Sequence, residues 1–270
     1  MVRGVRPVAR GRQILEMEFC RCDRKPITTR PAPASIRRQV NGQQIVDVER
    51  LAKRVVLLLE SEARLVIEPR MTGLMLVDEP PSVEHRRVCW HLNSQPALPS
   101  SIEFWDRRGL GTVSLLKPNQ FAELRSRLGP DALQLDGIGL RSILQKTSRP
   151  VKVALLEQHL IAGIGNLYAS EILHRAEVSP RKKSSRVTRA ECGRIADATQ
   201  FVLHEAIRYE GSTLGDGTYR NVLNQDGSYQ NQHRVYQKAG ETCPVCRTGT
   251  IRRIVQAQRS TFFCPRCQRA

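Results

Sequence analysis

The pattern of hydrophobic and polar positions changes character partway along the chain. Up to about residue 117, short runs rich in Val, Ile and Leu alternate with turn residues, which is typical of β-strands. A helix is expected over Met1–Ala9, ended by the turn residue Gly11, and a loop over Asp78–Ser82, which contains two prolines. The strand-like runs are Ile14–Phe19, Arg54–Leu59, Arg64–Ile67, Leu74–Val77 and Thr112–Leu116.

Beyond about residue 121 the apolar residues recur with helical spacing. Pro150 is a suitable first residue for one helix, and Thr188-Arg-Ala-Glu191 has the spacing of a capping box for another. A break is expected at Gly163-Ile-Gly-Asn166. The predicted helices cover Phe121–Leu128, Leu140–Gln145, Lys152–Ile161, Leu167–Ala176 and Thr188–Tyr209.

The segment Gly211–Tyr229 is rich in Gly, Ser, Asn, Asp and Thr, which predicts a long polar loop. Long loops within compact domains are often functional. A cysteine-containing module follows from Ala239 to the end. These changes in the hydrophobic and polar pattern divide the chain into three predicted domains: residues 1–117, mostly strands; residues 118–238, mostly helices; and residues 239–270, a small metal-binding module.

The last module carries Cys243-Pro-Val-Cys246 and Cys264-Pro-Arg-Cys267, with 17 residues between the two pairs. Two Cys-x-x-Cys pairs joined by a possible β-hairpin are the pattern of a tetrahedral four-thiolate zinc site. Four protein ligands leave no open position for water, so we expect one structural zinc ion. A 32-residue module buries little core, and metal binding would supply its folding energy. Its predicted hairpin is basic, with Thr250–Val255 alternating like a strand.

The charge balance points to a polyanionic partner. The formal net charge is +17 and the pI about 10.2, and basic residues are spread along the whole chain, which favours nucleic acid over a membrane surface. On charge alone, a ribosomal or structural RNA-binding protein remains an alternative. The longest aliphatic run, Val55–Leu59, is far below the roughly 20 apolar residues that cross a bilayer.

The beginning of the chain is arginine-rich without an apolar core, so we expect no secretory signal; a transit peptide is a weaker alternative. We expect a cytoplasmic, nucleoid-associated protein with reduced thiols at its scattered cysteines. These cysteines are Cys20, Cys22, Cys89 and Cys192.

Several segments resemble, in order, motifs of the formamidopyrimidine-DNA glycosylase family. Gln258-Arg-Ser-Thr-Phe-Phe-Cys-Pro-Arg-Cys-Gln268 resembles that family's C-terminal zinc finger. Val151-Lys-Val-Ala-Leu-Leu-Glu-Gln158 and Gly163-Ile-Gly-Asn-Leu-Tyr-Ala-Ser-Glu171 resemble its helix–two-turn–helix. Further similar segments are Phe104-Trp-Asp-Arg-Arg-Gly-Leu-Gly111 for the lesion-side loop, Arg70-Met-Thr-Gly73 for the intercalating turn and Arg50-Leu-Ala-Lys53 for the lysine-bearing strand.

The resemblance implies an α+β multidomain fold: an N-terminal β-sandwich, a helical helix–two-turn–helix domain and a C-terminal β-hairpin zinc finger. It implies a base-excision repair enzyme, a DNA glycosylase with abasic-site lyase activity that removes oxidised purines such as 8-oxoguanine and formamidopyrimidines. The expected partner is double-stranded DNA containing damaged bases or abasic sites. Zinc is the expected metal, no membrane is involved, and the protein is expected to act as a monomer.

Family members begin with Pro-Glu-Leu-Pro-Glu-Val-Glu-Thr, whose first residue supplies a secondary amine that attacks the deoxyribose C1′. That segment is absent ahead of Met1-Val-Arg-Gly-Val-Arg-Pro7. Two interpretations follow. Either the true start lies upstream, which we favour because so much other machinery is present, or the chain is a truncated paralogue. The chain as printed would then lack the nucleophile.

The resemblance also assigns roles to individual residues. Lys53 matches the lysine that donates a proton in β-elimination, although an exposed lysine at the end of a strand is the ordinary alternative. Arg259 matches the zinc-hairpin arginine of the δ-elimination step, where a permanently charged guanidinium would serve the departing phosphate. The positions that match DNA contacts are His85, Arg108, Lys152 and Asn166, with Lys146 near another.

Met71 and Leu110 match the side chains that fill the gap left by an everted nucleotide. Core packing is the alternative for both. The family usually has Phe at the position of Leu110 and a basic residue at that of Gly109, and these departures bear on lesion interrogation. The loop Gly211–Tyr229 matches the segment that closes over the everted base, with the backbone amides of Ser212–Tyr219 available to a purine carbonyl.

Two other functions remain open. The first is a non-catalytic binder of damaged or abasic DNA. The second is the sister family that acts on oxidised pyrimidines; the runs Gln258–Phe263 and Gln237–Gly240 favour the purine branch.

Overall fold

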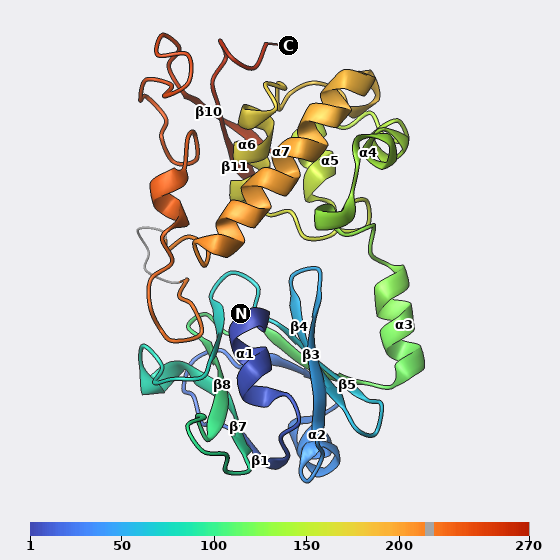
Figure 1. Ribbon diagram of the computed structural model, residues 1–270, viewed down its shortest axis with the longest axis vertical. Coiled ribbons are helices and arrows are strands. Elements are labelled where there is room, and N and C mark those ends of the chain that lie inside the picture. Colours follow the sequence, from blue (N-terminus) through green and yellow to red (C-terminus); the bar gives the residue numbers. More distant parts are fainter. Residues whose placement is uncertain (214–218, 270) are drawn as a thin grey trace. The chain divides into compact units, whose positions relative to one another are not determined.

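The computed structural model describes residues 1–213 and 219–269 and divides into two compact units (Figure 1). The first unit is formed by Met1–Ser126 together with Glu210–Ser228. The second consists of Arg127–Tyr209 and the chain from Tyr229 onward. The chain therefore leaves the first unit, builds most of the second, returns for one segment and then completes the second.

The first unit contains two β-sheets that share one hydrophobic core, as expected for a β-sandwich. Among its described residues, all strand pairs are antiparallel except β2 with β9. One sheet has the order β2 (Thr28–Arg30), β9 (Thr112–Leu116), β5 (Arg64–Glu68), β4 (Arg54–Leu59), β3 (Ile45–Leu51). The other has the order β1 (Ile14–Phe19), β7 (Arg86–Leu92), β8 (Ser101–Asp106), β6 (Gly73–Leu76).

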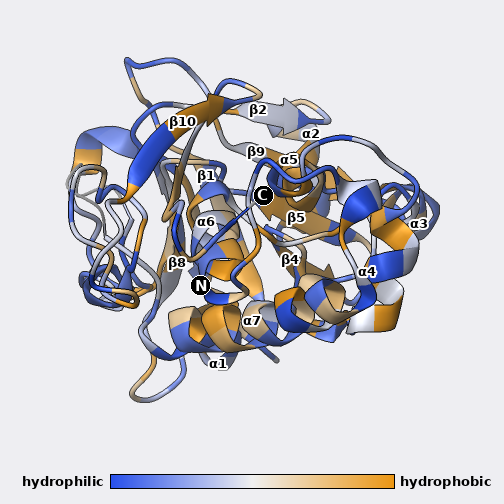
Figure 2. Ribbon diagram, turned by 90° about the horizontal axis from the view of Figure 1, so that it is seen from above, coloured by the Kyte–Doolittle hydropathy of each residue, from blue (hydrophilic) through white to orange (hydrophobic). Residues whose placement is uncertain are grey.

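Hydrophobic strands supply most of this core. β4 and β5 are largely apolar along their length (Figure 2), because both lie inside the five-stranded sheet. Two helices, α1 (Val2–Ala9) and α2 (Pro33–Val40), add Val5 and Ile36 to the same core. A third helix, α3 (Pro118–Ser126), ends the first continuous stretch of the unit.

The returning segment is built into the first unit by a close contact. The backbone N–H of Val77 donates to the carbonyl oxygen of Val222 at 2.9 Å, and the Val222 side chain belongs to the sandwich core. A Cβ atom on Gly4 would lie 2.2 Å from Cγ2 of Val222, so α1 needs glycine there to admit this side chain. Isolated bridges join Ser212 to Ser228 and Arg220 to Asp226.

Four α-helices form the core of the second unit: α4 (Gly137–Leu144), α5 (Val151–Leu156), α6 (Asn166–Arg175) and α7 (Arg189–Arg208). The expected capping box of α7 is present, with Thr188 Oγ1 accepting from the Glu191 N–H and the Glu191 carboxylate accepting from the Thr188 N–H. The unit also contains the short 3₁₀ helices η2 (Ala132–Gln134), η3 (Ser184–Arg186) and η4 (Tyr229–Gln232), whereas η1 (Val83–His85) belongs to the first unit.

The second unit also contains the hairpin of β10 (Arg252–Gln256) and β11 (Arg259–Phe263). Its two-residue turn places Ala257 and Gln258 at φ values of 45° and 61°. A positive φ at both central residues is what a tight hairpin requires. The hairpin predicted between the two cysteine pairs is confirmed.

Several expected elements differ from those observed. The helix expected over Lys152–Ile161 ends at Leu156, because Glu157 adopts an extended conformation. Lys53, expected in a strand, lies in the turn between β3 and β4. The elements not predicted are β2, β3, β7, β8 and α2. In the part of the chain that the structure describes, no helix has both the length and the apolarity to cross a membrane.

Candidate nucleic-acid interface and metal centre

The four cysteines of the last module converge on one point. All four sulfur atoms lie within 4.8 Å of one another, and two cross pairs, Cys243 with Cys267 and Cys246 with Cys264, are separated by 3.8 and 3.7 Å. A tetrahedral zinc ion with bonds of about 2.3 Å places its sulfur ligands roughly 3.8 Å apart. A disulfide would require about 2.05 Å. The cluster therefore fits one zinc ion with four thiolate ligands.

The backbone around the cluster is shaped for thiolates. The N–H of Gly249 donates to Cys246 Sγ at 3.2 Å, and a Cβ atom at Gly249 would come within 2.6 Å of Cys264 Sγ. Glycine at this position lets the main chain reach the sulfur atoms and donate to one of them. Hydrogen bonds of this kind orient and stabilise metal ligands.

Helix α6 holds the zinc module in place. The buried carboxylate of Glu171 accepts the backbone N–H groups of Arg234, Val235 and Tyr236 at 2.8–3.0 Å, which fixes the chain that leads into the module. Beyond the end of α6, the carbonyl oxygen of Val178 accepts from the side-chain amide of the buried Gln268. The finger is therefore packed on the helical domain through directed polar contacts as well as apolar ones.

A buried lysine joins α5 to the start of α6 and the hairpin. The Lys152 side chain is 0% exposed, and its ammonium donates to Asn166 Oδ1 at 2.6 Å, Thr261 Oγ1 at 2.8 Å and the Ser260 carbonyl at 3.0 Å. Asn166 Nδ2 also donates to the Ser260 carbonyl at 3.0 Å. Burial, together with the smaller effect of the nearby Arg259 charge, lowers the pKa of Lys152 to about 8.

The resemblance implied DNA contacts for Lys152 and Asn166. In this structure the Lys152 ammonium points into the protein, because Asn166, Ser260 and Thr261 use its three donor positions. Asn166 is the first residue of α6, and its side chain is likewise committed to Lys152 and the hairpin. Both residues hold β11 against α6 in this structure, and their contact with DNA stays a prediction.

Arg259 lies at the first position of β11, directly after the hairpin turn, and its side chain is exposed. Arg252 and Arg253 of β10 are exposed as well. The hairpin therefore presents cationic side chains to solvent while Thr261, Phe262 and Phe263 are buried. Lys146, just past the end of α4, is exposed in the same unit.

The turn between β5 and β6 carries Met71, which is 74% exposed. Core packing, the alternative considered for this residue, is therefore wrong. The preceding residue, Arg70, has a φ of 57°, and the following residue, Thr72, is buried and hydrogen-bonded to the carboxylate of Asp106. The Thr72–Asp106 hydrogen bond thus anchors the turn, while the methionine side chain projects from it.

Asp106 also shapes the loop that follows β8. Its carboxylate accepts the backbone N–H of Gly111 at 2.8 Å and that of Arg108 at 3.2 Å. Leu110 is half-buried between these two anchor points, and Arg108 is exposed. One fully buried carboxylate therefore organises both the turn that bears Met71 and the loop that bears Leu110.

The local backbone explains why glycine occupies position 109 in this chain. Its φ is +60°, and a Cβ atom there would lie 1.9 Å from the carbonyl oxygen of Lys25. A basic side chain, which the family usually has at this position, would collide with that backbone. The close approach of the Lys25 backbone therefore excludes a basic residue at position 109.

The remaining candidates lie apart from the zinc module in the sequence. His85 is buried, packs edge-on against Trp105 with ring centroids 5.3 Å apart, and lies 3.3 Å from a Glu84 carboxylate oxygen. Lys53 is exposed in the turn between β3 and β4. Of the amides expected to contact a base, those of residues 214–218 lie outside the described residues.

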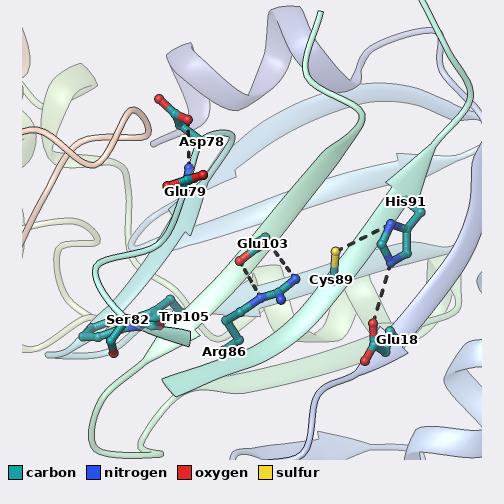
Figure 3. A network of polar contacts seen from close by, with 9 residues as sticks. All are labelled: Glu18, Asp78, Glu79, Ser82, Arg86, Cys89, His91, Glu103 and Trp105. Carbon is teal, nitrogen blue, oxygen red and sulfur yellow. Dashed lines mark hydrogen bonds and ion pairs between the residues drawn. The ribbon is translucent and has the colours of Figure 1, made fainter. Parts of the chain in front are cut away.

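A polar network on β1, β7 and β8 surrounds Cys89, one of the scattered cysteines (Figure 3). Arg86 pairs with Glu103 at 2.7 Å, and Cys89 Sγ lies 3.9 Å from the His91 ring nitrogen. Burial raises the pKa of Cys20 to about 11 and also raises that of Cys89. Both thiols therefore stay protonated near neutral pH.

Sequence reasoning missed the residues that hold others in place. Asp106 stood inside the quoted Phe104–Gly111 segment, and Glu171 closed the Gly163–Glu171 segment, yet neither received a role. Thr261 lay inside the Gln258–Gln268 segment that resembles the zinc finger, and it also received no role. The only available signal was a carboxylate within an otherwise apolar or glycine-rich motif, which is weak without coordinates.

Comparison with known proteins places this site in a family. Residues 1–113 match the formamidopyrimidine-DNA glycosylase N-terminal domain, residues 128–217 match that family's H2TH domain, and residues 240–270 match the zinc finger found in FPG and IleRS. The formamidopyrimidine-DNA glycosylase of Chloroflexus aurantiacus is 38% identical, over 99% of this chain and 94% of that protein. That of Paracoccus denitrificans is 35% identical, over 98% and 96%.

Solved structures of Fpg proteins have the same fold as this chain. The MutM (Fpg) protein of Thermus thermophilus superposes with a TM-score of 0.84 at 32% identity, covering 99% of this chain and 95% of that one. The Lactococcus lactis Fpg, in complex with DNA that contains an abasic site, superposes with a TM-score of 0.86 at 26% identity, covering 100% and 97%.

The fold and the four-cysteine centre are those of a zinc-finger DNA glycosylase of base-excision repair. The chain belongs to the formamidopyrimidine-DNA glycosylase family.

Proposed function

We propose that this protein removes oxidised purines, 8-oxoguanine and formamidopyrimidines, from double-stranded DNA and cleaves the resulting abasic site as a lyase. The observation that carries the proposal is the position of Asp106, whose buried carboxylate anchors both the turn of Met71 and the loop of Leu110. Base excision from a duplex needs the damaged nucleotide everted and the gap filled by apolar side chains. Met71 is exposed on an ordered turn, as such a wedge must be.

The charge distribution supports a DNA ligand. Arg108, Lys146 and Arg259 are exposed cations, and the chain as a whole carries a formal charge of +17. Phosphate contacts of this kind supply affinity without sequence preference, which suits an enzyme that must find rare lesions. The Lactococcus lactis Fpg has been crystallised with DNA containing an abasic site and with DNA containing Fapy-dG. These relatives support the ligand class proposed for this protein, which we take to act as a monomer at the nucleoid.

The proposed chemistry divides between an amine and two later groups. An amine attacks the deoxyribose C1′, the base leaves, and an imine to the opened sugar remains. In the family that amine belongs to the N-terminal proline. We assign Lys53 to proton transfer during β-elimination and Arg259 to the phosphate that departs in the next elimination. Because both residues act after the imine has formed, neither substitutes for the attacking amine.

The test compares two forms of the protein on duplexes containing 8-oxoguanine, thymine glycol or an abasic-site analogue. One form is residues 1–270, and the other carries Pro-Glu-Leu-Pro-Glu-Val-Glu-Thr ahead of Met1 with its initiator methionine removed. We expect the second form to excise 8-oxoguanine and to be trapped on DNA by borohydride, which reduces the imine. We expect the first to bind the abasic duplex without being trapped.

Each outcome has a defined meaning. Preferential excision of thymine glycol would replace the purine assignment with a pyrimidine one. Strong trapping of residues 1–270 alone would show that another amine is the nucleophile. If neither form excises any base while both bind the abasic duplex tightly, the protein is a non-catalytic binder, and the half-buried Leu110 in place of Phe would be the first residue to examine.

A further inference from the structure

A histidine of α6 lies against the zinc cluster without belonging to it. Nε2 of His174 is 3.4 Å from Sγ of Cys243, and both side chains are almost completely buried. Three sulfur atoms besides that of Cys243 complete the cluster, so His174 is not required as a ligand. Its contact is with a ligand atom, which is where an outer hydrogen-bond donor to a metal site belongs.

The surroundings of Nδ1, the other ring nitrogen of His174, indicate which of the two nitrogens carries the proton of the neutral ring. Nδ1 of His174 is buried and has no hydrogen-bond partner among the described residues. A proton on Nδ1 would leave a buried donor unpaired and would aim the Nε2 lone pair at a zinc-bound thiolate, which is negatively charged. A proton on Nε2 pairs the donor with the sulfur and leaves only a bare acceptor at Nδ1. The second arrangement avoids both costs.

We propose that His174 donates an Nε2–H···Sγ hydrogen bond to the zinc-bound Cys243 thiolate and acts as a positioning residue for the metal centre. The hydrogen bond withdraws charge from the thiolate and holds the first cysteine of the cluster in place. Without this hydrogen bond, one of the contacts that hold the Cys243 sulfur in place is lost, and zinc should leave faster.

The same bond connects the metal to the other contacts of α6. Asn166, at the start of the helix, binds the hairpin through the Ser260 carbonyl, and Glu171 binds the chain leading into the module. His174 lies eight residues beyond Asn166, which is about 12 Å along the helix axis. The three side chains attach one helix to the hairpin, the entry segment and the zinc centre in turn. We therefore expect zinc binding to stiffen the attachment of β11 to α6.

The test measures zinc release from the intact protein into a chromophoric chelator, 4-(2-pyridylazo)resorcinol. His174→Phe keeps an aromatic ring but has no donor, and we expect zinc release about tenfold faster, the lower end of the effects seen for outer ligands. In His174→Gln the side-chain amide nitrogen reaches about as far as Nε2, and we expect release near the wild-type rate. His204→Phe, an exposed position on α7, is the matched control.

The proposal is overturned if His174→Phe releases zinc at the wild-type rate, or if His174→Gln, folded by its melting curve, is as fast as His174→Phe. A measurement on the wild type does not depend on any variant folding. In ¹⁵N-labelled protein, the His174 ring should show a protonated Nε2 and an unprotonated Nδ1, and a ¹¹³Cd-substituted sample should show coupling between cadmium and the Nε2 proton. The opposite tautomer would overturn the proposal.

Discussion

The ammonium nitrogen of Lys152 lies 2.6 Å from Oδ1 of Asn166, so that a buried cation from α5 is hydrogen-bonded to the first residue of α6. The same ammonium reaches β11 through Thr261 and Ser260. A buried charge is tolerated only when its donors are matched by acceptors. Here those acceptors belong to the two elements that must stay together if Arg259 is to keep a fixed position.

Replacing Lys152 by Met should leave these acceptors unpaired in the interior. We expect the free energy of unfolding to fall by about 2 kcal/mol. We also expect the step assigned to Arg259 in the proposed mechanism, cleavage at the second phosphate, to slow more than base release. Chemical denaturation and single-turnover assays on labelled duplexes measure the two effects. Lys146→Met, at an exposed position, is the control and should leave stability nearly unchanged. Equal loss in both variants would contradict the prediction.

Stability should depend on pH through the same residue. Burial lowers the pKa of Lys152 to about 8 in the folded protein, against an ordinary value of 10.5. Between these pH values the unfolded chain keeps a proton that the folded protein has released, so the contribution of Lys152 to stability rises with pH. The stability difference between wild type and Lys152→Met should therefore grow from pH 7.5 to pH 9.5. A difference that stays constant over this range would show that the folded-state pKa is not lowered, and one that shrinks would show that it is raised.

Met71→Ala should separate stability from function. Because the side chain is 74% exposed, the free energy of unfolding should change by less than about 0.5 kcal/mol. Binding to a duplex with an abasic-site analogue should weaken about tenfold, which corresponds to about 1.4 kcal/mol, since the gap in the base stack loses its filler. Val83→Ala, at a residue 72% exposed on η1, is the matched control. Fluorescence anisotropy at fixed salt gives both affinities, and identical affinities would argue against a wedge.

Two glycines with positive φ provide an internal comparison. Gly11→Ala introduces a Cβ atom into open space at φ +78°, so only the backbone conformation is strained, at about 1 kcal/mol. Gly109→Ala adds a collision with the Lys25 carbonyl at φ +60°, and we expect a loss of about 3 kcal/mol in total. Thermal melts of the two variants test the difference. Similar melting temperatures would show that the segment around Lys25 yields easily.

Removing one zinc ligand should disable the hairpin. Cys264→Ser should lose its zinc, as measured by elemental analysis, and should bind duplex DNA more weakly because the cationic hairpin depends on the metal for its fold. Cys22→Ser, outside the cluster, should retain both zinc and affinity. Full DNA affinity in a zinc-free Cys264→Ser protein would show that the hairpin does not contribute to binding.

The sequence allowed the repeated, local features to be predicted. The capping box of α7, the bounds of β1, β4 and β9, and the zinc ligands follow from short-range spacing, which the structure confirms. β7 and β8 were missed because charged and polar residues such as Arg87 and Glu103, both buried, interrupt their apolar pattern. Their strand character depends on partners in the sheet rather than on their own composition.

The positions of the candidate site residues could be foreseen only in part, for the same reason. Exposed residues such as Met71 and Arg259 could be named from motifs, because their expected roles depend on their own side chains and not on contacts with distant residues. The inward direction of Lys152 could not be foreseen, since its three acceptors include residues more than 100 positions away in the sequence. Nor could the double role of Asp106, which depends on two turns meeting at one carboxylate.

The seat of Val222 against Gly4 limits how the protein can be dissected. The sandwich takes part of its core from a segment that follows α7. A fragment ending at Ser126 would therefore have a cavity in place of the Val222 side chain, and the backbone N–H of Val77 would lose its hydrogen-bond acceptor. Expressing the N-terminal half by itself should give an aggregation-prone product, whereas supplying the Glu210–Ser228 stretch as a covalent graft after Ser126 should restore it. The first unit therefore cannot be produced from one continuous part of the gene. Recombination between homologues should succeed only when residues 1–126 and 210–228 are exchanged together.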